Sequence, residues 1–181
     1  MRHPFMRVWL WLVPLGVLAQ PSSKVLVAAG REVTVQVLNP GTLECIGGTP
    51  TGNPQGPLCS PGTKRILLKD RKSVNQYQEI TGSAATLIQG SNVTITNCNL
   101  DENYQGQCGG RFEWTVPAAA GRWEGFWGGE FDMATGNIRY SATGIGHRGQ
   151  LEKMHMQYEA AYTGPGPGFF ILNLRALFER H

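Results

Sequence analysis

The fold prediction starts from one stretch, Gly121-Arg-Trp-Glu-Gly-Phe-Trp-Gly-Gly-Glu-Phe131. In an extended strand, successive side chains point to opposite faces of the sheet. One face of this stretch then carries Trp123, Trp127 and Phe131 with glycines between them, and the other is mainly charged. Glycines beside large rings leave room for those rings and allow the strand to bend. The stretch therefore predicts a strand of a tightly curved sheet rather than a cluster of reactive groups.

Short alternating runs of this kind recur along the chain, whereas helix signals are scarce. Turn-forming Gly, Pro and Asn residues separate the runs, and the chain contains 24 glycines. Short strands with turn signals between them indicate an all-β sandwich or barrel. We expect one antiparallel barrel of about eight strands, with the last run as a strand rather than a helix. The expected runs are residues 32–38, 64–68, 74–81, 92–97, 111–116, 122–132, 137–143, 151–162 and 169–178.

Two of the neighbouring runs repeat the division into an apolar and a polar face. In one interpretation, the apolar faces fill the interior and the polar faces meet solvent. In the other, polar side chains line a barrel lumen, and the aromatic side chains face a second element or a partner. The residues that we expect to contact a ligand lie on the apolar faces: Trp114, Trp123, Trp127, Phe131, Met154, Met156 and Tyr158.

The first residues have the composition of a secretory signal peptide. Arg2 and Arg7 provide positive charge around the start of the apolar run Val8–Ala19, as in such leaders. A membrane anchor is the alternative, but the run is shorter than the roughly 20 residues that a spanning helix needs, and Pro14 interrupts it. We expect removal of residues 1–19, leaving residues 20–181 as one domain with no stable membrane span.

Removal of the leader also changes the charge balance. The formal charge of the whole chain is +3, and it falls to +1 without Arg2 and Arg7. Proteins that bind nucleic acid usually present a strong excess of positive charge. The composition therefore predicts no nucleic-acid partner.

The four cysteines fit an exported protein. Cys45 and Cys59 bracket one turn rich in Gly and Pro, and Cys98 and Cys108 bracket a second turn. Pairing within each turn is the simplest of the three connectivities. A zinc site is the alternative, but zinc sites favour closer spacing, and an oxidising compartment favours disulfides. We expect two disulfides, no metal, and a secreted or periplasmic protein.

His147 and Glu124 are the candidate catalytic residues. His147 lies in the glycine-rich corner Gly144–Gly149, where an imidazole could act as a general base or only fix the turn. Glu124 is one of several acids on the strand faces, and a solvated carboxylate is its alternative role. The chain has no nucleophile elbow, zinc-protease motif or phosphate loop, and we expect no cofactor. Asn92-Val-Thr94 would be a glycosylation acceptor in a eukaryotic source.

The run from Gly82 to Gly149 resembles a group of secreted β-barrel proteins that are similar to allene oxide cyclases and dirigent proteins. Three pieces carry the resemblance in order: Gly110–Val116, with a Gly-x-Phe start; Gly121–Gly128, with Gly-x-Trp-Glu-Gly; and Gly144–Gly149, with Gly-x-Gly-His-x-Gly. The resemblance implies a calycin-like, eight-stranded antiparallel barrel whose subunits associate through the outside. In the characterised relatives the barrel holds a hydrophobic small molecule. No functional residue of those relatives maps onto a position here.

These observations lead to one expected function and two alternatives. We expect an exported β-barrel protein that binds a small apolar ligand or a protein partner, because aromatic and methionine-rich cavities favour apolar molecules. The first alternative is an isomerase or cyclase that acts on a hydrophobic small molecule. The second is a structural envelope protein that forms a homo-oligomer. Binding without catalysis is the favoured expectation.

Overall fold

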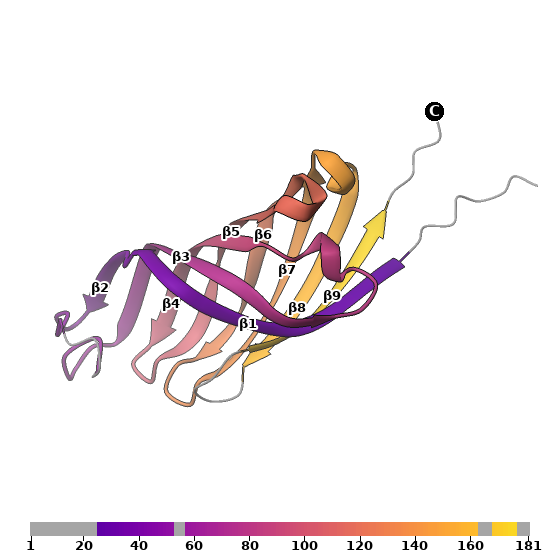
Figure 1. Cartoon of the computed structure of the whole chain (residues 1–181). Coiled ribbons are helices and arrows are strands. Elements are labelled where there is room, and N and C mark those ends of the chain that lie inside the picture. Colours follow the sequence, from indigo (N-terminus) through magenta and orange to yellow (C-terminus); the bar gives the residue numbers. More distant parts are fainter. Residues whose placement is uncertain (1–24, 53–56, 163–167, 177–181) are drawn as a thin grey trace, which may run out of the picture.

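The computed structural model describes residues 25–52, 57–162 and 168–176 (Figure 1). The predicted signal peptide, residues 1–19, lies outside the described residues. Three short 3-10 turns interrupt a chain that is otherwise built from strands. The elements are β1 (Val25–Asn39), β2 (Thr42–Ile46), β3 (Arg65–Thr81), η1 (Ala85–Leu87), β4 (Ser91–Asp101), β5 (Gln105–Val116), η2 (Pro117–Ala119), β6 (Gly121–Asp132), β7 (Asn137–His147), η3 (Gly149–Leu151), β8 (Met154–Tyr162) and β9 (Gly168–Ala176).

The strands form one antiparallel sheet in the order β1-β9-β8-β7-β6-β5-β4-β3-β2. Eight of them form a half-barrel that curls through 230°, and the short β2 extends the sheet beyond β3. The long strand β1 also pairs with two strands from opposite ends of the curl, β9 over Val25–Glu32 and β3 over Ala29–Asn39 (Figure 1). The prediction of an all-β, antiparallel, strongly curved sheet is therefore confirmed.

Glycines at close approaches between strands allow this curvature. A Cβ atom at Gly125 would lie 2.0 Å from the carbonyl oxygen of Thr143 on the neighbouring strand. A Cβ atom at Gly146 would lie 1.9 Å from the carbonyl oxygen of Leu151. Real Cβ atoms do not come so close to backbone oxygens, because packed interiors tolerate no such overlap. The curved strand predicted for residues 122–132 is confirmed, as β6 spans Gly121–Asp132.

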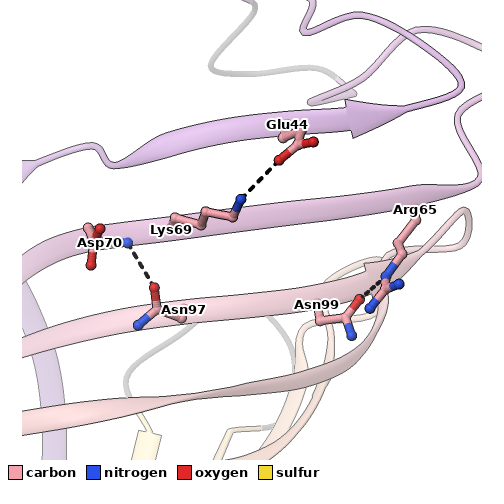
Figure 2. Close-up of polar contacts among 6 residues, drawn as sticks. All are labelled: Glu44, Arg65, Lys69, Asp70, Asn97 and Asn99. Carbon is pink, nitrogen blue, oxygen red and sulfur yellow. Dashed lines mark hydrogen bonds and ion pairs between the residues drawn. The ribbon is translucent and has the colours of Figure 1, made fainter.

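A β-bulge joins two predicted runs, residues 64–68 and 74–81, into the single strand β3. The register with β4 shifts by one residue between Leu68 and Arg71. Asp70, within the bulge, has a φ of 55°, and its amide donates a hydrogen bond of 3.0 Å to Asn97 Oδ1 (Figure 2). An extra residue on one strand reverses which side chains point inward. The bulge therefore places Ser73, Asn75 and Tyr77 inside the curl, where all three are buried.

The inner face of β1 is polar, which its alternating pattern does not reveal. Glu32 is only 1% exposed, whereas Val35 is 47% exposed. Alternation defines two faces but does not say which of them is buried. Because β1 pairs with β3 beside the inward-pointing Tyr77, the Glu32 side chain enters the interior.

Two features of the strands differ from the expected runs. The strand expected from residue 151 begins at Met154, and Leu151 is instead fully buried in η3. The short strand β2 was not predicted. The final run forms a strand, β9, as expected, although residues 177–178 of that run lie outside the described residues.

Both predicted disulfides are present, Cys45–Cys59 and Cys98–Cys108. Cys98 and Cys108 face each other directly in the ladder between β4 and β5, so their bridge links two neighbouring strands. Two disulfides indicate an oxidising, extracytoplasmic environment. No helix within the described ranges has the length and apolar character needed to cross a membrane.

Polar contacts strengthen the β2 side of the sheet. Lys69 of β3 pairs with Glu44 of β2 at 3.0 Å, and Arg65 of β3 donates to Asn99 of β4 at 2.5 Å (Figure 2). These side chains are exposed, so each contact contributes little stability by itself. They lie outside the curl and take no part in the site described below.

Candidate functional site

The interior of the curl is divided into a packed part and a cavity. The packed part lies beneath the three 3-10 turns, where Ala84, Ile88, Val116, Trp123 and Leu151 are fully buried. The turns η2 and η3 contact each other, and both contact β6 (Figure 1). The Trp123 Nε1–H donates to the Leu87 carbonyl at 2.9 Å, so this end of the interior is filled and its buried indole is satisfied.

The cavity lies beside this packed part and has a volume of about 210 Å³; a second buried cluster packs around Ile66, Leu100 and the two disulfides. One wall, from β1, β3 and β4, is polar. Its hydroxyl and amide groups pair mainly with each other: Thr34 Oγ1 donates to Asn75 Oδ1 at 2.9 Å, and Ser73 and Thr94 share a hydrogen bond of 2.9 Å. This wall comprises Glu32, Thr34, Ser73, Asn75, Asn92, Thr94 and Thr96.

The opposite wall, from β5 to β8, is aromatic and apolar. It comprises Phe112, Trp114, Trp127, Phe131, Ile138, Ala142 and Met156. The Trp127 ring lies 5.9 Å from that of Phe131 and 5.4 Å from that of Tyr140, centroid to centroid. A cavity with one aromatic wall and one polar wall suits a molecule that has an apolar body and a polar edge.

Glu32 is the centre of a buried hydrogen-bond cluster at the polar wall. Asn75 Nδ2 donates to Glu32 Oε1 at 2.9 Å, and the Tyr77 hydroxyl donates to the same oxygen at 3.3 Å. The hydroxyl of Tyr158 donates to Oε2 at 2.5 Å, and that of Tyr140 also donates to Oε2. Both oxygens of one buried carboxylate are thus held by neutral donors, which satisfies its hydrogen-bonding capacity. We refer to Glu32, Asn75, Tyr77, Tyr140 and Tyr158 as the Glu32 cluster.

The tyrosines of this cluster remain protonated across a wide pH range. Burial, and then the negative charge of Glu32, raises the pKa of Tyr77 and Tyr140 well above the ordinary value. Burial, and then the neighbouring tyrosines and Glu32, raises the pKa of Tyr158 in the same way. Burial and Glu32 also raise the pKa of Tyr162, which lines the cavity near Tyr140. The phenol groups therefore act as hydrogen-bond donors toward Glu32.

Three buried polar atoms of the cavity lining have no hydrogen-bond partner among the described residues. They are Asn92 Oδ1, Trp114 Nε1 and Trp127 Nε1. A buried donor or acceptor without a partner destabilises a fold by about 1–3 kcal/mol. Such atoms are usually satisfied by water or by a ligand. All three atoms belong to residues that line the cavity, and each atom is itself almost completely covered by protein.

The cavity reaches solvent beside the turn between β6 and β7. Met133 in this turn lines the cavity and is 38% exposed. Arg71, which directly follows the bulge of β3, also lines the cavity and is half-buried. The site therefore has an entrance and a deep end, where the Glu32 cluster lies against Trp114.

The predicted ligand-contacting residues divide between the two parts of the interior. Trp114, Trp127, Phe131, Met156 and Tyr158 line the cavity. The remaining two, Trp123 and Met154, belong to the buried core and do not line it. For all seven residues, contact with a ligand stays a prediction.

The two candidate catalytic residues lie together on the outer face of the sheet. His147 Nε2 is 3.6 Å from Glu124 Oε2, and both side chains are about two-fifths exposed, at 44% and 40%. The hydrogen bond from Arg122 lowers the pKa of the Glu124 carboxyl. Neither His147 nor Glu124 lines the interior cavity; both line a separate hollow on the outer face, together with Phe126 and Ile145.

Sequence reasoning missed the Glu32 cluster. Alternation along β1 could have suggested an inward polar face, but only the pairing with β3 decides it. Asn92 was seen only as a glycosylation acceptor. In the structure it is 5% exposed, and its Nδ2 donates to the Tyr77 hydroxyl at 2.7 Å, so the folded chain has no room for a glycan there.

Within the part of the chain that the structure describes, no three His, Cys, Asp or Glu side chains lie close enough together to form a metal site. The chemistry of the cavity comes from aromatic rings, hydroxyl and amide groups, and one buried carboxylate. In comparisons with models of protein families, with curated proteins and with solved structures, the chain has no significant match.

Proposed function

We propose that this chain is an exported ligand-binding protein that holds a small molecule inside its curled sheet. The observation that carries the proposal is the two-walled cavity, which reaches solvent near Met133 and contains unpartnered buried polar atoms. An apolar cavity of about 150 Å³ can hold benzene. A cavity of about 210 Å³ therefore suits one ring with a short substituent. The aromatic wall would bury the ring, and the polar wall would orient the substituent.

The resemblance to allene oxide cyclase and dirigent barrels belongs to the same proposal. We propose that the eight long strands act as a closed, calycin-like barrel. The pairing of β1 with both β9 and β3 supports closure, because it links strands from the two ends of the curl. The disulfides support a secreted or periplasmic location.

A pair of neighbouring substitutions on β7 tests the binding proposal. Ala142 lines the cavity, whereas Ser141 is exposed on the opposite face. Ala142→Phe would fill the cavity, and Ser141→Phe would add the same ring outside it. Native mass spectrometry of the protein purified from its own host should detect a retained small molecule in the wild type and in Ser141→Phe, but not in Ala142→Phe. Retention by Ala142→Phe, or a wild type free of any small molecule, would contradict the proposal.

A second candidate is an isomerase or cyclase reaction on the bound molecule. The buried carboxylate of Glu32 favours it, because a carboxylate in a water-poor cavity can accept a proton from a carbon acid. This reaction would convert the retained molecule when it is added back to the protein. Recovery of the molecule unchanged after prolonged incubation would exclude catalysis on it.

Separately, we propose that the outer face of the sheet binds a protein partner or a second copy of this chain. Phe126 is 72% exposed there, and Ile145 on the next strand is also exposed. Exposed large apolar side chains on one sheet face favour protein association. Analytical ultracentrifugation of wild type and Phe126→Ser tests it. We expect the wild type to sediment as an oligomer that Phe126→Ser weakens, whereas a monomeric wild type at all concentrations would contradict the proposal.

A further inference from the structure

The deep end of the cavity contains a buried carboxylate, that of Glu32, which has no cationic partner among the described residues. The Glu32 side chain is 1% exposed. None of the ion pairs formed between described residues includes Glu32. Removing an ion from water is costly unless an opposite charge or strong hydrogen bonds compensate for the lost hydration. The Glu32 cluster supplies the hydrogen bonds, but it leaves the negative charge in place.

The directions of these hydrogen bonds fit an ionised carboxylate. Asn92 Nδ2 donates to the Tyr77 oxygen at 2.7 Å, and the Tyr77 hydroxyl donates to Glu32 Oε1. Asn75 also presents an N–H to this oxygen. An ionised carboxylate only accepts hydrogen bonds, whereas a protonated one must also donate. The neighbours of Glu32 act as donors, which suits the charged form.

Arg71 lines the same cavity but lies too far along the strand to serve as the partner of Glu32. Glu32 stands opposite Tyr77 in the ladder between β1 and β3. Arg71 precedes Tyr77 by six residues, a distance of roughly 20 Å along a strand. Arg71 therefore belongs to the entrance region, and the charge at the deep end lacks a counterion.

Aromatic rings surround the same end of the cavity. The Tyr77 and Trp114 rings are stacked with centroids 4.0 Å apart. The Tyr158 ring approaches Trp114 edge-on at 6.4 Å. Ring faces attract cations, and tryptophan attracts them most strongly. Asn92 Oδ1 is a buried acceptor without a partner among the described residues, so an N–H donor would also satisfy it.

We propose that the ligand is a small amine, with one ring and a short substituent that carries the amino group, and that it binds with its protonated nitrogen beside the Glu32 cluster. This inference rests on the proposed binding function and adds the chemical class of the ligand. The nitrogen would be attracted by the charge of Glu32 and could donate to Asn92 Oδ1. The ring of the ligand would lie against the aromatic wall, near Trp127 and Phe131.

Two probes of nearly equal size and shape test this class of ligand. Benzylamine is protonated near neutral pH, whereas benzyl alcohol is neutral, and both fit one ring with a short substituent. Isothermal titration calorimetry of the mature, disulfide-bonded protein should give benzylamine at least about tenfold tighter binding than the alcohol, as expected for a charge-assisted contact. Equal affinity for the two probes, or tighter binding of the alcohol, would overturn the inference without affecting the proposed function.

Two variants show whether Glu32 causes the preference. Glu32→Gln keeps the size of the side chain and removes the charge, so we expect the tenfold preference for benzylamine over benzyl alcohol to disappear, as measured by the ratio of the two dissociation constants. Glu159→Gln is the matched control, because it makes the same change at an exposed position of β8 that does not line the cavity, and the preference should persist. A preference that survives Glu32→Gln would overturn the inference. If Glu32→Gln does not fold, as seen by circular dichroism, the wild-type comparison of the two probes decides alone. Absence of binding by either probe would contradict the proposed function, and with it the inference.

Discussion

Trp123 and Trp127 lie four residues apart on the same face of β6, yet they occupy different kinds of interior. Trp123 is fully buried, and its indole N–H donates to the Leu87 carbonyl. Trp127 is half-buried against the cavity, and its indole N–H has no partner among the described residues. The same alternation in one strand therefore produced a core residue and a cavity residue.

The difference comes from what covers each position. The turns η1, η2 and η3 gather over the end that contains Trp123 and fill it with Leu87, Ala119 and Leu151. No such turn fills the space beside Trp127, where the opposite wall carries short polar side chains. An aromatic inner face is thus compatible with a packed core or with a binding cavity, and the connecting turns decide between them.

The largest effect that we predict is on the packed end. Trp123→Ala should lower the free energy of unfolding by about 3–5 kcal/mol, because it leaves a cavity and an unpartnered Leu87 carbonyl in a filled core. Trp127→Ala should lower the free energy of unfolding by only about 1–2 kcal/mol, because Trp127 is half-buried and lines the cavity. Urea unfolding of both variants measures the difference. Equal losses of unfolding free energy in the two variants would show that Trp123 and Trp127 are packed alike, which would contradict the comparison.

A second comparison tests the close approach of strands that curves β6. Gly125→Ala should lower the free energy of unfolding by about 1–3 kcal/mol, since the new Cβ would lie 2.0 Å from the Thr143 oxygen and force β7 to move. Gly128→Ala is the control on the same strand, where the nearest atom to a Cβ is 3.8 Å away. Its stability should stay the same or rise by about 0.5 kcal/mol. Similar losses in both variants would contradict this account of the curvature.

The Glu32 cluster should make the fold sensitive to alkaline pH. The pKa values of Tyr77, Tyr140 and Tyr158 are raised in the folded protein. Their contribution to the free energy of unfolding is therefore complete below pH ~10, the pKa of tyrosine in the unfolded chain, and is lost progressively above it. Each such tyrosine should lower the free energy of unfolding by up to about 1.4 kcal/mol per pH unit above pH ~10.

Ultraviolet absorbance of tyrosinate measures this effect in the variant Tyr104→Phe, which removes the one tyrosine outside the cavity. The absorbance should rise only together with loss of the fold as seen by circular dichroism. Adding Tyr140→Phe should make the loss of stability with pH less steep. Ionisation of the remaining tyrosines in a fully folded protein would contradict the burial of the cluster.

The smallest change in stability that we predict comes from a substitution on the outer face of the sheet. Phe126 is 72% exposed, so Phe126→Ser should change the free energy of unfolding of the monomer by less than about 0.5 kcal/mol. Urea unfolding at low protein concentration measures it. A loss as large as that of Trp127→Ala would mean that Phe126 packs within the monomer.

The sequence was sufficient to predict the sheet and much of its interior. Alternation and turn residues located most strands, and the spacing of the cysteines led to both disulfides. Large apolar side chains at every second position defined the two faces of β6 and β8, but they left open which face is inside. These features are local, because each depends on neighbouring residues in the chain.

The site itself was less predictable because it depends on pairing between distant segments. A bulge at Asp70 reverses the inward face of β3, and no strong turn signal marks it in the sequence. The partner of Glu32 across the ladder, Tyr77, is 45 residues away. Strand periodicity could not reveal that a glutamate, an asparagine and three tyrosines from different strands converge on one point.

The most direct test of a cavity beside a packed core is a nuclear magnetic resonance titration with benzylamine, in which the tryptophan indole N–H signals are followed. Outside the predicted leader, the tryptophans are Trp114, Trp123 and Trp127, so each end of the interior has its own reporter. We predict that the signals of Trp114 and Trp127 shift with saturation while that of Trp123 stays in place. An equal shift of Trp123, or no shift of any of the three, would contradict the account.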